Sequence, residues 1–255
     1  MGRLYTLFRW EMNDLIKVVL LFFGILLVGM SMKQELMGVS NSMGFISGTD
    51  LQLFGASQAS GVSTSIQGML SLEDVWTLAG FLILLLGALT FRYDRDSGVA
   101  KSVYSLPYSN DEIFGIKLIS LLIYGSLMLL LPFAYVAITT YASIAGYLPE
   151  ITSRFLSDAL LLVAFLVLYL IAVATLVSLA FPNAFLAFMA GFAVIYAPKI
   201  LGNSSMPPAL FINALHLCGS TDFNVFKAAY LEWGIVVPIV IFLLSWVLIR
   251  RRDVV

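Results

Sequence analysis

Charged residues, cysteine and histidine are all scarce in this sequence. Only 11% of the residues are charged and 60% are hydrophobic, whereas a soluble domain has roughly 25% charged and 45–50% apolar residues. The 14 basic and 15 acidic residues nearly balance, which gives no support for a nucleic-acid partner. A single cysteine, Cys218, excludes an intrachain disulfide and a multi-thiolate metal site. A single histidine, His216, removes most catalytic triads and most His-based metal centres, so no metal site is expected.

Two kinds of energy-coupling chemistry are also missing. The phosphate-loop pattern G-x-x-x-x-G-K-[ST] does not occur, and no Gly-Lys pair exists anywhere in the chain. No charged residue lies at the centre of an apolar run, although proton-coupled transport usually relies on such groups. Intramembrane hydrolysis would need a carboxylate pair or an activated nucleophile. We therefore expect neither an enzyme nor an ion-coupled carrier, and no cofactor bound by this chain itself.

Six apolar segments are long enough to cross a bilayer, whose core of roughly 30 Å takes about 20 helical residues. They cover residues 15–32, 75–91, 117–141, 159–181, 184–201 and 230–249. Pro182 and Asn183 separate the fourth from the fifth, because proline cannot continue a helix and Pro-Asn suits a tight turn. Lys17, near the start of the first span, is expected to extend toward the headgroups. The prediction is an all-α, polytopic membrane protein with one transmembrane domain over residues 1–255.

Basic residues indicate the direction of these spans. With the N-terminus inside, ten of the 14 Lys and Arg residues fall on the cytoplasmic side, as the positive-inside rule expects. These ten are Arg3, Arg9, Lys17, Arg92, Arg95, Lys101, Lys117, Arg250, Arg251 and Arg252. We therefore predict a multi-pass protein of the cell membrane with both termini in the cytoplasm. The first apolar run has no cleavage site behind it and is interpreted as a retained helix.

Residues 1–14 have apolar side chains at helical spacing. Leu4, Leu7, Phe8 and Met12 could share one face of a helix that lies in the cytoplasmic interface. The alternative is a polar tail in which the apolar residues are merely scattered.

Two outside segments are long. Residues 33–72 are rich in Ser, Gly and Gln, and composition leaves open a flexible tether or a folded cap with a short helix. Residues 202–229 contain Pro207 and Pro208, followed by the apolar stretch ALFINALHL. That stretch is too short to span, so we predict a re-entrant or interfacial helix.

The cytoplasmic loop of residues 92–116 is the only one large enough for a partner protein to grip. Residues 99–106 could form a short amphipathic helix on the membrane surface. Ser109 or Asn110 can then cap the next helix. Glu112 lies three residues after Ser109, which fits a capping box.

The residues of this loop form an extended pattern. It reads Phe91-x-x-Asp94-x-Asp96-x-Gly98, then Ser105-Leu106-Pro107-Tyr108-Ser109-x-x-Glu112-Ile113, then Lys117. The pattern resembles the signature loop of type-2 ABC exporter permeases, in which an acidic residue and Gly follow the second span and a Ser-Leu-Pro-Val-Ser-Arg-like segment and a Lys come next. Asp94 stands where Glu is commoner, Tyr108 where Val is, and Asn110 where Arg is. The topology also matches over the whole chain, whereas the motif covers residues 91–117 only.

The resemblance implies the membrane-spanning permease subunit of an ABC exporter. Two permease copies would pair as a homodimer or related heterodimer within the lipid, and two soluble ATPase subunits, which bind ATP and Mg²⁺, would dock on the loop. The positions carried over to that ATPase-coupling region are Asp94, Asp96, Gly98, Leu106, Pro107, Ser109, Glu112 and Lys117. The same residue types also make an ordinary capped turn at a membrane surface. The alternative function is therefore a scaffold or assembly subunit of a larger membrane complex, which would share the hydropathy.

Overall fold

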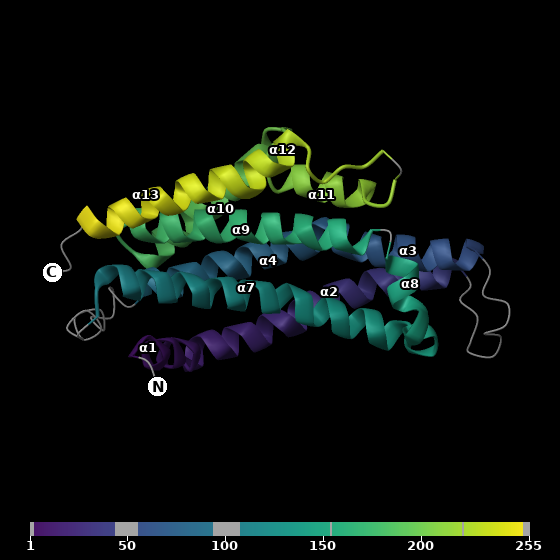
Figure 1. Cartoon of the computed structure of the whole chain (residues 1–255), viewed down its shortest axis with the longest axis horizontal. Helices are drawn as coiled ribbons and strands as arrows, with labels where there is room; N and C mark the ends of the chain where they lie inside the picture. The colour runs from purple at the N-terminus through teal and green to yellow at the C-terminus, as the bar shows by residue number, and fades with distance from the viewer. Residues whose placement is uncertain (1–2, 44–55, 94–107, 154, 221, 252–255) are drawn as a thin grey trace.

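The computed structural model describes residues 3–43, 56–93, 108–153, 155–220 and 222–251. Within these ranges the chain is mainly helical and contains no strand, and the long helices lie side by side in an elongated bundle (Figure 1). The elements are α1 (Arg3–Met12), α2 (Leu15–Met43), α3 (Ala56–Ser71), α4 (Glu73–Gly87), η2 (Ala88–Tyr93), α7 (Asn110–Thr140), η3 (Ala142–Tyr147), α8 (Leu148–Thr152), α9 (Leu156–Ala180), α10 (Ala184–Ile200), α11 (Ala209–Leu217), α12 (Ala228–Leu231), η4 (Glu232–Val236) and α13 (Val237–Arg251). Here η2 and η4 are π-helical and η3 is a 3-10 helix. The all-α prediction is confirmed.

Five helical stretches are long and apolar enough to cross a membrane. They are Leu15–Gln34, Gly61–Arg92, Asn110–Thr140, Leu156–Ala180 and Ala228–Arg250. The remaining predicted span corresponds to α10, which has only 17 residues and is therefore about 25 Å long at ~1.5 Å per residue. That length is at the lower limit for a transmembrane helix. The described chain thus has the architecture of a polytopic membrane protein.

Helix α9 lies at the centre of the bundle (Figure 1). It contacts α4, α7, α10 and α13, and most of its side chains are buried. A helix that is apolar on all sides is expected in such a position. Its two buried hydroxyls stay within the helix: Thr175 donates to the carbonyl of Ile171 at 2.8 Å and Ser178 to that of Ala174 at 2.6 Å. The hydroxyl protons of these two residues are therefore used within the helix itself.

Glycines allow close contact between neighbouring helices. A Cβ on Gly87 would lie 2.8 Å from the Cβ of Ala174, and a Cβ on Gly191 would lie 2.5 Å from Cδ2 of Leu84. Both distances are shorter than a normal carbon–carbon contact. Small residues at helix contacts are the usual way for membrane helices to gain packing, since lipid provides no hydrophobic driving force between them.

The bundle has two distinct ends. The proximal end consists of α1, the first turn of α7 and the last turn of α13, and both chain termini lie there (Figure 1). The distal end consists of α3, α8 and α11, and α3 contacts both of the others.

For residues 33–72 the sequence left open a flexible tether or a folded cap with a short helix. Helix α2 continues to Met43 and α3 occupies Ala56–Ser71, so the described part of this segment is helical, while residues 44–55 lie outside the described residues. Ser and Gly are weak helix formers, and packing of α3 against α2, α8 and α11 overrides that preference. Extended backbone at Leu72 (ψ 122°) separates α3 from α4.

The predicted short helix after the fifth apolar segment is confirmed as α11. The chain leaves α10 at Gly202, whose φ of 68° favours glycine. The N–H of Gly202 donates to Lys199 and that of Asn203 to Pro198, which pairs the last carbonyls of α10. Helix α11 then packs with its buried side chains against α3 and α9.

Candidate functional site

Helix α7 begins at the proximal end with a complete capping box. The Ser109 Oγ accepts a hydrogen bond from the N–H of Glu112 at 3.2 Å, and Glu112 Oε2 accepts one from the N–H of Ser109 at 2.7 Å. Both N–H groups would otherwise lack an intrahelical partner. Ser109, and not Asn110, is the capping residue. The capping box predicted from the sequence is confirmed.

Asp111, in the same turn, joins α7 to the end of α13. Its Oδ2 lies 2.6 Å from Nη2 of Arg250, and its Oδ1 accepts from Arg250 Nε at 3.2 Å and from Trp246 Nε1 at 2.8 Å. The guanidinium carbon of Arg250 lies 3.9 Å from the centroid of the Trp246 ring. A two-point guanidinium–carboxylate pair fixes orientation as well as distance, and the ring adds a cation–π contact. Sequence reasoning missed this cluster.

Lys117 connects α7 to η2. Its side chain is 4% exposed, and Nζ donates to the carbonyl of Thr90 at 2.6 Å. Next to this bond the rings of Phe91 and Phe114 pack with their centroids 5.8 Å apart. π-Helical turns are frequent at functional sites. These contacts fix the two helical ends that flank residues 94–107.

The eight predicted coupling residues divide into two groups. Ser109, Glu112 and Lys117 lie in the first two turns of α7 or directly before them, and all three make the contacts given above. The other five lie outside the described residues: Asp94, Asp96, Gly98, Leu106 and Pro107. The proposed short helix of residues 99–106 lies outside them as well.

Helix α1 packs against the start of α7. Leu7 is buried in a small cluster with Ile113 and Ile116, and Phe8 covers it. The predicted helix at the N-terminus is therefore confirmed. Leu4 is 49% exposed, so only part of the predicted apolar face packs against the rest of the chain, and its position in the membrane interface stays a prediction.

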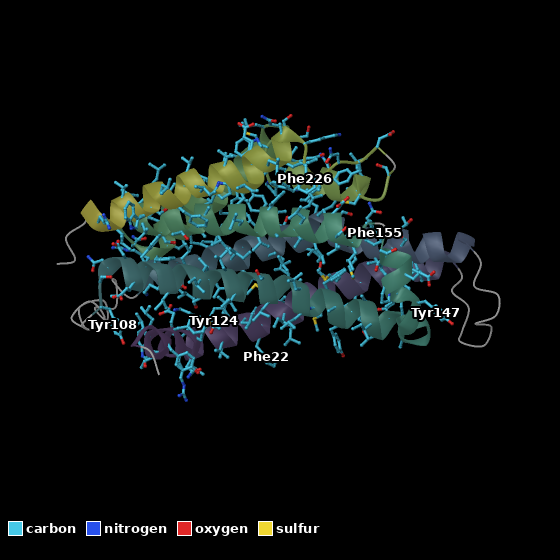
Figure 2. All side chains as sticks on the ribbon, in the orientation of Figure 1. Phe22, Tyr108, Tyr124, Tyr147, Phe155 and Phe226 are labelled. Atoms are coloured by element: carbon cyan, nitrogen blue, oxygen red, sulfur yellow. The ribbon has the colours of Figure 1, made fainter. Side chains whose placement is uncertain are left out.

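Lys17 does not extend toward the headgroups, contrary to the sequence prediction. It is 2% exposed and forms ion pairs with buried Glu11 and, at 3.4 Å, with Asp14. Helix α1 turns back at residues 13–14, which brings the Glu11 carboxylate to the ammonium group, and a paired buried charge is tolerated where an unpaired one is not. Tyr124 of α7, labelled in Figure 2, closes the junction by donating to the carbonyl of Met12 at 2.7 Å.

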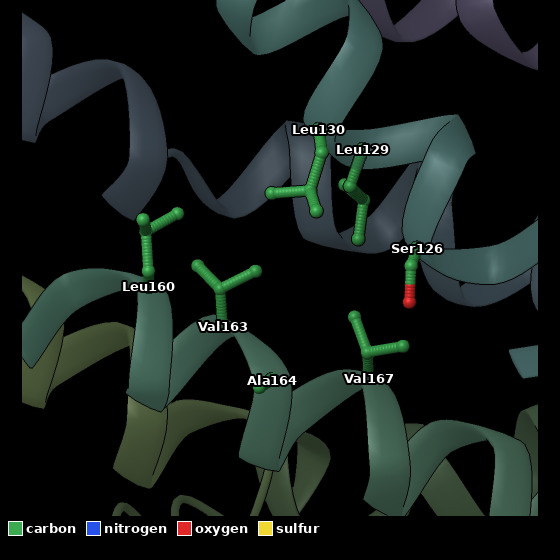
Figure 3. Close-up of a pocket in the computed structure, with 7 residues that line it drawn as sticks. All are labelled: Ser126, Leu129, Leu130, Leu160, Val163, Ala164 and Val167. Atoms are coloured by element: carbon green, nitrogen blue, oxygen red, sulfur yellow. The ribbon is translucent and has the colours of Figure 1, made fainter. Parts of the chain in front are cut away.

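A shallow apolar cleft of about 170 Å³ lies between α7 and α9 (Figure 3). It is lined by Ser126, Leu129, Leu130, Leu160, Val163, Ala164 and Val167. The Ser126 hydroxyl is its only polar side-chain group, so the cleft has no acid, base or nucleophile pair. It is also smaller than the roughly 300–1,000 Å³ of a typical ligand pocket. Within the described residues, no three His, Cys, Asp or Glu side chains are grouped to hold a metal ion. The proximal end is therefore the candidate site.

No protein-family model, no curated protein and no solved structure matches this chain.

Proposed function

We propose that this chain is the membrane-spanning permease subunit of an ABC exporter, which moves a substrate with energy from a separate ATPase. The observation that carries the proposal is a set of contacts at the two helix ends on either side of residues 94–107, which are the end of η2 and the start of α7. On one side Thr90 is bound by Lys117, and on the other Ser109 and Glu112 form a capping box. A segment held in this way can transmit a force from a protein that binds it into the helices on both sides.

The contacts of α7 provide routes for that force. Asp111 connects its first turn to Arg250 in α13. Leu7 and Tyr124 connect it to α1 and to the α1–α2 junction. A displacement of the loop would therefore reach the first, third and last spans together. In this proposal the five residues Asp94, Asp96, Gly98, Leu106 and Pro107 face the ATPase, whereas Ser109, Glu112 and Lys117 stiffen the support behind them.

The proposed topology has six spans, with α10 as the fifth. Its 17 residues can cross if the bilayer is locally thin or the flanking side chains extend to the interface. The proximal end is cytoplasmic, because ten of the 14 basic residues belong to segments on that side. Two copies of the chain, or this chain and a related one, pair in the cell membrane and bind two ATPase subunits, which hold the ATP and Mg²⁺.

Co-purification with an ATPase tests this proposal. The chain is co-expressed with a candidate soluble ATPase, extracted in detergent, and compared with Glu112→Ala and Pro107→Ala variants. Glu150→Ala is the matched control, since Glu150 also lies in the first turn of a helix but is exposed at the distal end. We expect wild type and control to retain the ATPase and its hydrolysis, and the two loop variants to lose binding or coupling.

A scaffold or assembly subunit is the alternative that this experiment separates. If no ATPase associates, or if the loop variants bind and support hydrolysis like wild type, the coupling role is wrong. The capping box would then stabilise an ordinary turn at the membrane surface, and co-purifying membrane proteins would identify the larger complex.

A further inference from the structure

The last turn of α11, at the distal end, has backbone carbonyls that need hydrogen-bond donors from outside the helical pattern. Helix α11 has nine residues and is therefore only about 14 Å long. Like every helix it ends with carbonyl groups that have no intrahelical partner. Leu215 and Cys218 at this end are 0% and 4% exposed, whereas His216 and Leu217 between them are exposed, so water reaches the carbonyls of this turn only in part. Leaving such carbonyls unpaired is costly.

Gln67 of α3 supplies donors to this turn, in addition to the N–H of Cys218, which donates to the carbonyl of Leu215 at 3.3 Å. Its Nε2 lies 2.7 Å from the carbonyl oxygen of Leu215, 3.0 Å from that of His216 and 2.7 Å from that of Cys218. The two N–H groups of one side-chain amide are thus shared among three carbonyls at the end of a helix about 150 residues away. A carboxylate at this position could not donate at all, so the site requires a donor.

Ser71 adds a second contact from the same face of α3. It follows Gln67 by four residues, which places the two side chains one above the other on a helix. Its Oγ lies 3.0 Å from Nδ1 of His216. Within the turn itself, the Ser220 hydroxyl donates a hydrogen bond to the carbonyl of Leu217. The end of α11 is therefore paired mainly by α3, a segment far away in the sequence.

We propose that Gln67 is the positioning residue that holds α11 against α3, so that the two helices form one cap over the distal end of the bundle. The cap is continuous with the second span, since α3 leads through Leu72 into α4. We call the cap closed when α11 is packed against α3, and this contact forms within the chain itself. Only the cap's description as the exit side of an exporter rests on the proposed function.

Cys218 reports whether this cap is closed. It is the only cysteine in the chain, it is 4% exposed, and its own carbonyl is one of the three that Gln67 binds. Burial, with a smaller contribution from the charge of Asp158, raises the pKa of its thiol to about 12. Since the thiolate is the reactive form, a maleimide should label Cys218 slowly while α11 stays in place.

The test measures the rate at which a maleimide–polyethylene glycol reagent labels Cys218 in the full chain reconstituted in liposomes. Gln67→Leu keeps the size of the side chain but removes its donors, and Gln67→Glu replaces donors by acceptors. We expect both to label at least about tenfold faster than wild type, because each leaves the carbonyls of His216 and Cys218 without the donor that Gln67 provides. Gln67→Lys restores a donor and should label within about twofold of wild type. Gln34→Leu is the matched control, as Gln34 is exposed on α2.

Two results would overturn the proposal. One is labelling of Gln67→Leu and Gln67→Glu at the wild-type rate. The other is equally fast labelling of Gln67→Lys and Gln67→Leu, which would show that shape and not donation matters. If Gln67→Leu does not fold, the comparison of Gln67→Glu with Gln67→Lys decides the same question. No ATPase takes part, so failure here is distinct from failure of the permease proposal.

Discussion

The Asp111 carboxylate lies 2.6 Å from Nη2 of Arg250, which joins the first turn of α7 to the last turn of α13 across 139 positions of the sequence. Both side chains are about half exposed, so salt should screen their attraction. We expect Asp111→Asn to lower the melting temperature slightly at low ionic strength and not at 1 M NaCl. Thermal unfolding in detergent at both salt concentrations measures this. A loss of melting temperature that is unchanged by salt would contradict an electrostatic origin.

The buried pair of Glu11 and Lys17 should respond much more strongly to mutation. Glu11→Gln leaves the Lys17 ammonium, which is 2% exposed, without its main partner. Removing one partner of a buried ion pair typically costs about 3–5 kcal/mol. Asp14→Asn is the matched control, since Asp14 is 36% exposed and 3.4 Å from Nζ. Denaturant unfolding followed by circular dichroism gives both values, and a Glu11→Gln loss no larger than that of Asp14→Asn would refute the prediction.

Replacing both members of that pair should be far milder than replacing one. Glu11→Leu combined with Lys17→Met removes the two charges together and fills similar volumes, so neither charge is left uncompensated. We expect the double variant to recover most of the stability lost in Glu11→Gln. The same unfolding measurement applies, and a double variant as unstable as the single one would show that a specific polar role is lost.

The capping box predicts a graded response at Ser109. Ser109→Ala removes the acceptor for the N–H of Glu112, and loss of an N-cap costs about 0.5–2 kcal/mol. Ser109→Asp keeps an acceptor and should behave like wild type. Hydrogen exchange at the first turn of α7 should accelerate in Ser109→Ala only. Equal exchange in both variants would mean that the cap does not hold this helix end.

The raised pKa of the Cys218 thiol should make the stability of the folded chain depend on pH. The thiol pKa is about 12 in the folded chain against 9.0 for the unperturbed group. The unfolded state therefore loses its proton first as pH rises, and stability falls from about pH 9 upward, whereas below pH 8 the group has no effect. The wild type should be progressively destabilised relative to Cys218→Ala between pH 9 and 11. Melting temperatures of the two proteins across pH 7–11 check this, and a constant difference would contradict it.

Alanine substitutions at two glycines should change the stability of the chain in opposite directions. Gly87→Ala would place a Cβ 2.8 Å from the Cβ of Ala174, which has no flexible end to move aside, and such overpacking costs about 1–3 kcal/mol. Gly115→Ala meets no atom within 4 Å and should stabilise the helix by roughly 0.5–1 kcal/mol. Unfolding free energies measure both. Ala174→Gly should rescue Gly87→Ala, and failure to do so would place the strain elsewhere.

Local patterns were enough for the helices and for one part of the candidate site. Apolar run length predicts the helical segments, and the Ser109–Glu112 spacing predicts a cap that needs only four neighbouring residues. At the Pro-Asn break, where the sequence predicted a tight turn, Asn183 caps α10 by accepting from the N–H of Leu186 at 2.7 Å. Each of these features depends on interactions within a few positions, where backbone geometry leaves little choice.

The prediction for Lys17 was wrong for the opposite reason. A lysine near the end of an apolar run is expected to reach the headgroups when it is considered alone. The sequence does not show that α1 folds back and presents Glu11 to it. The helix at residues 56–71 could not be predicted from composition either. A segment rich in Ser and Gly has little helical preference of its own, and it becomes helical through its tertiary contacts.

The sequence by itself determined that the chain is helical, that it has membrane-length apolar segments and where α7 begins, because these follow from hydropathy and local hydrogen bonding. Only the tertiary structure decided which polar groups meet: Asp111 with Arg250, Glu11 with Lys17, and Gln67 with the end of α11. The physical reason is that a polar side chain in an apolar bundle must find a partner wherever helix packing brings one, and that partner bears no fixed relation to distance along the chain.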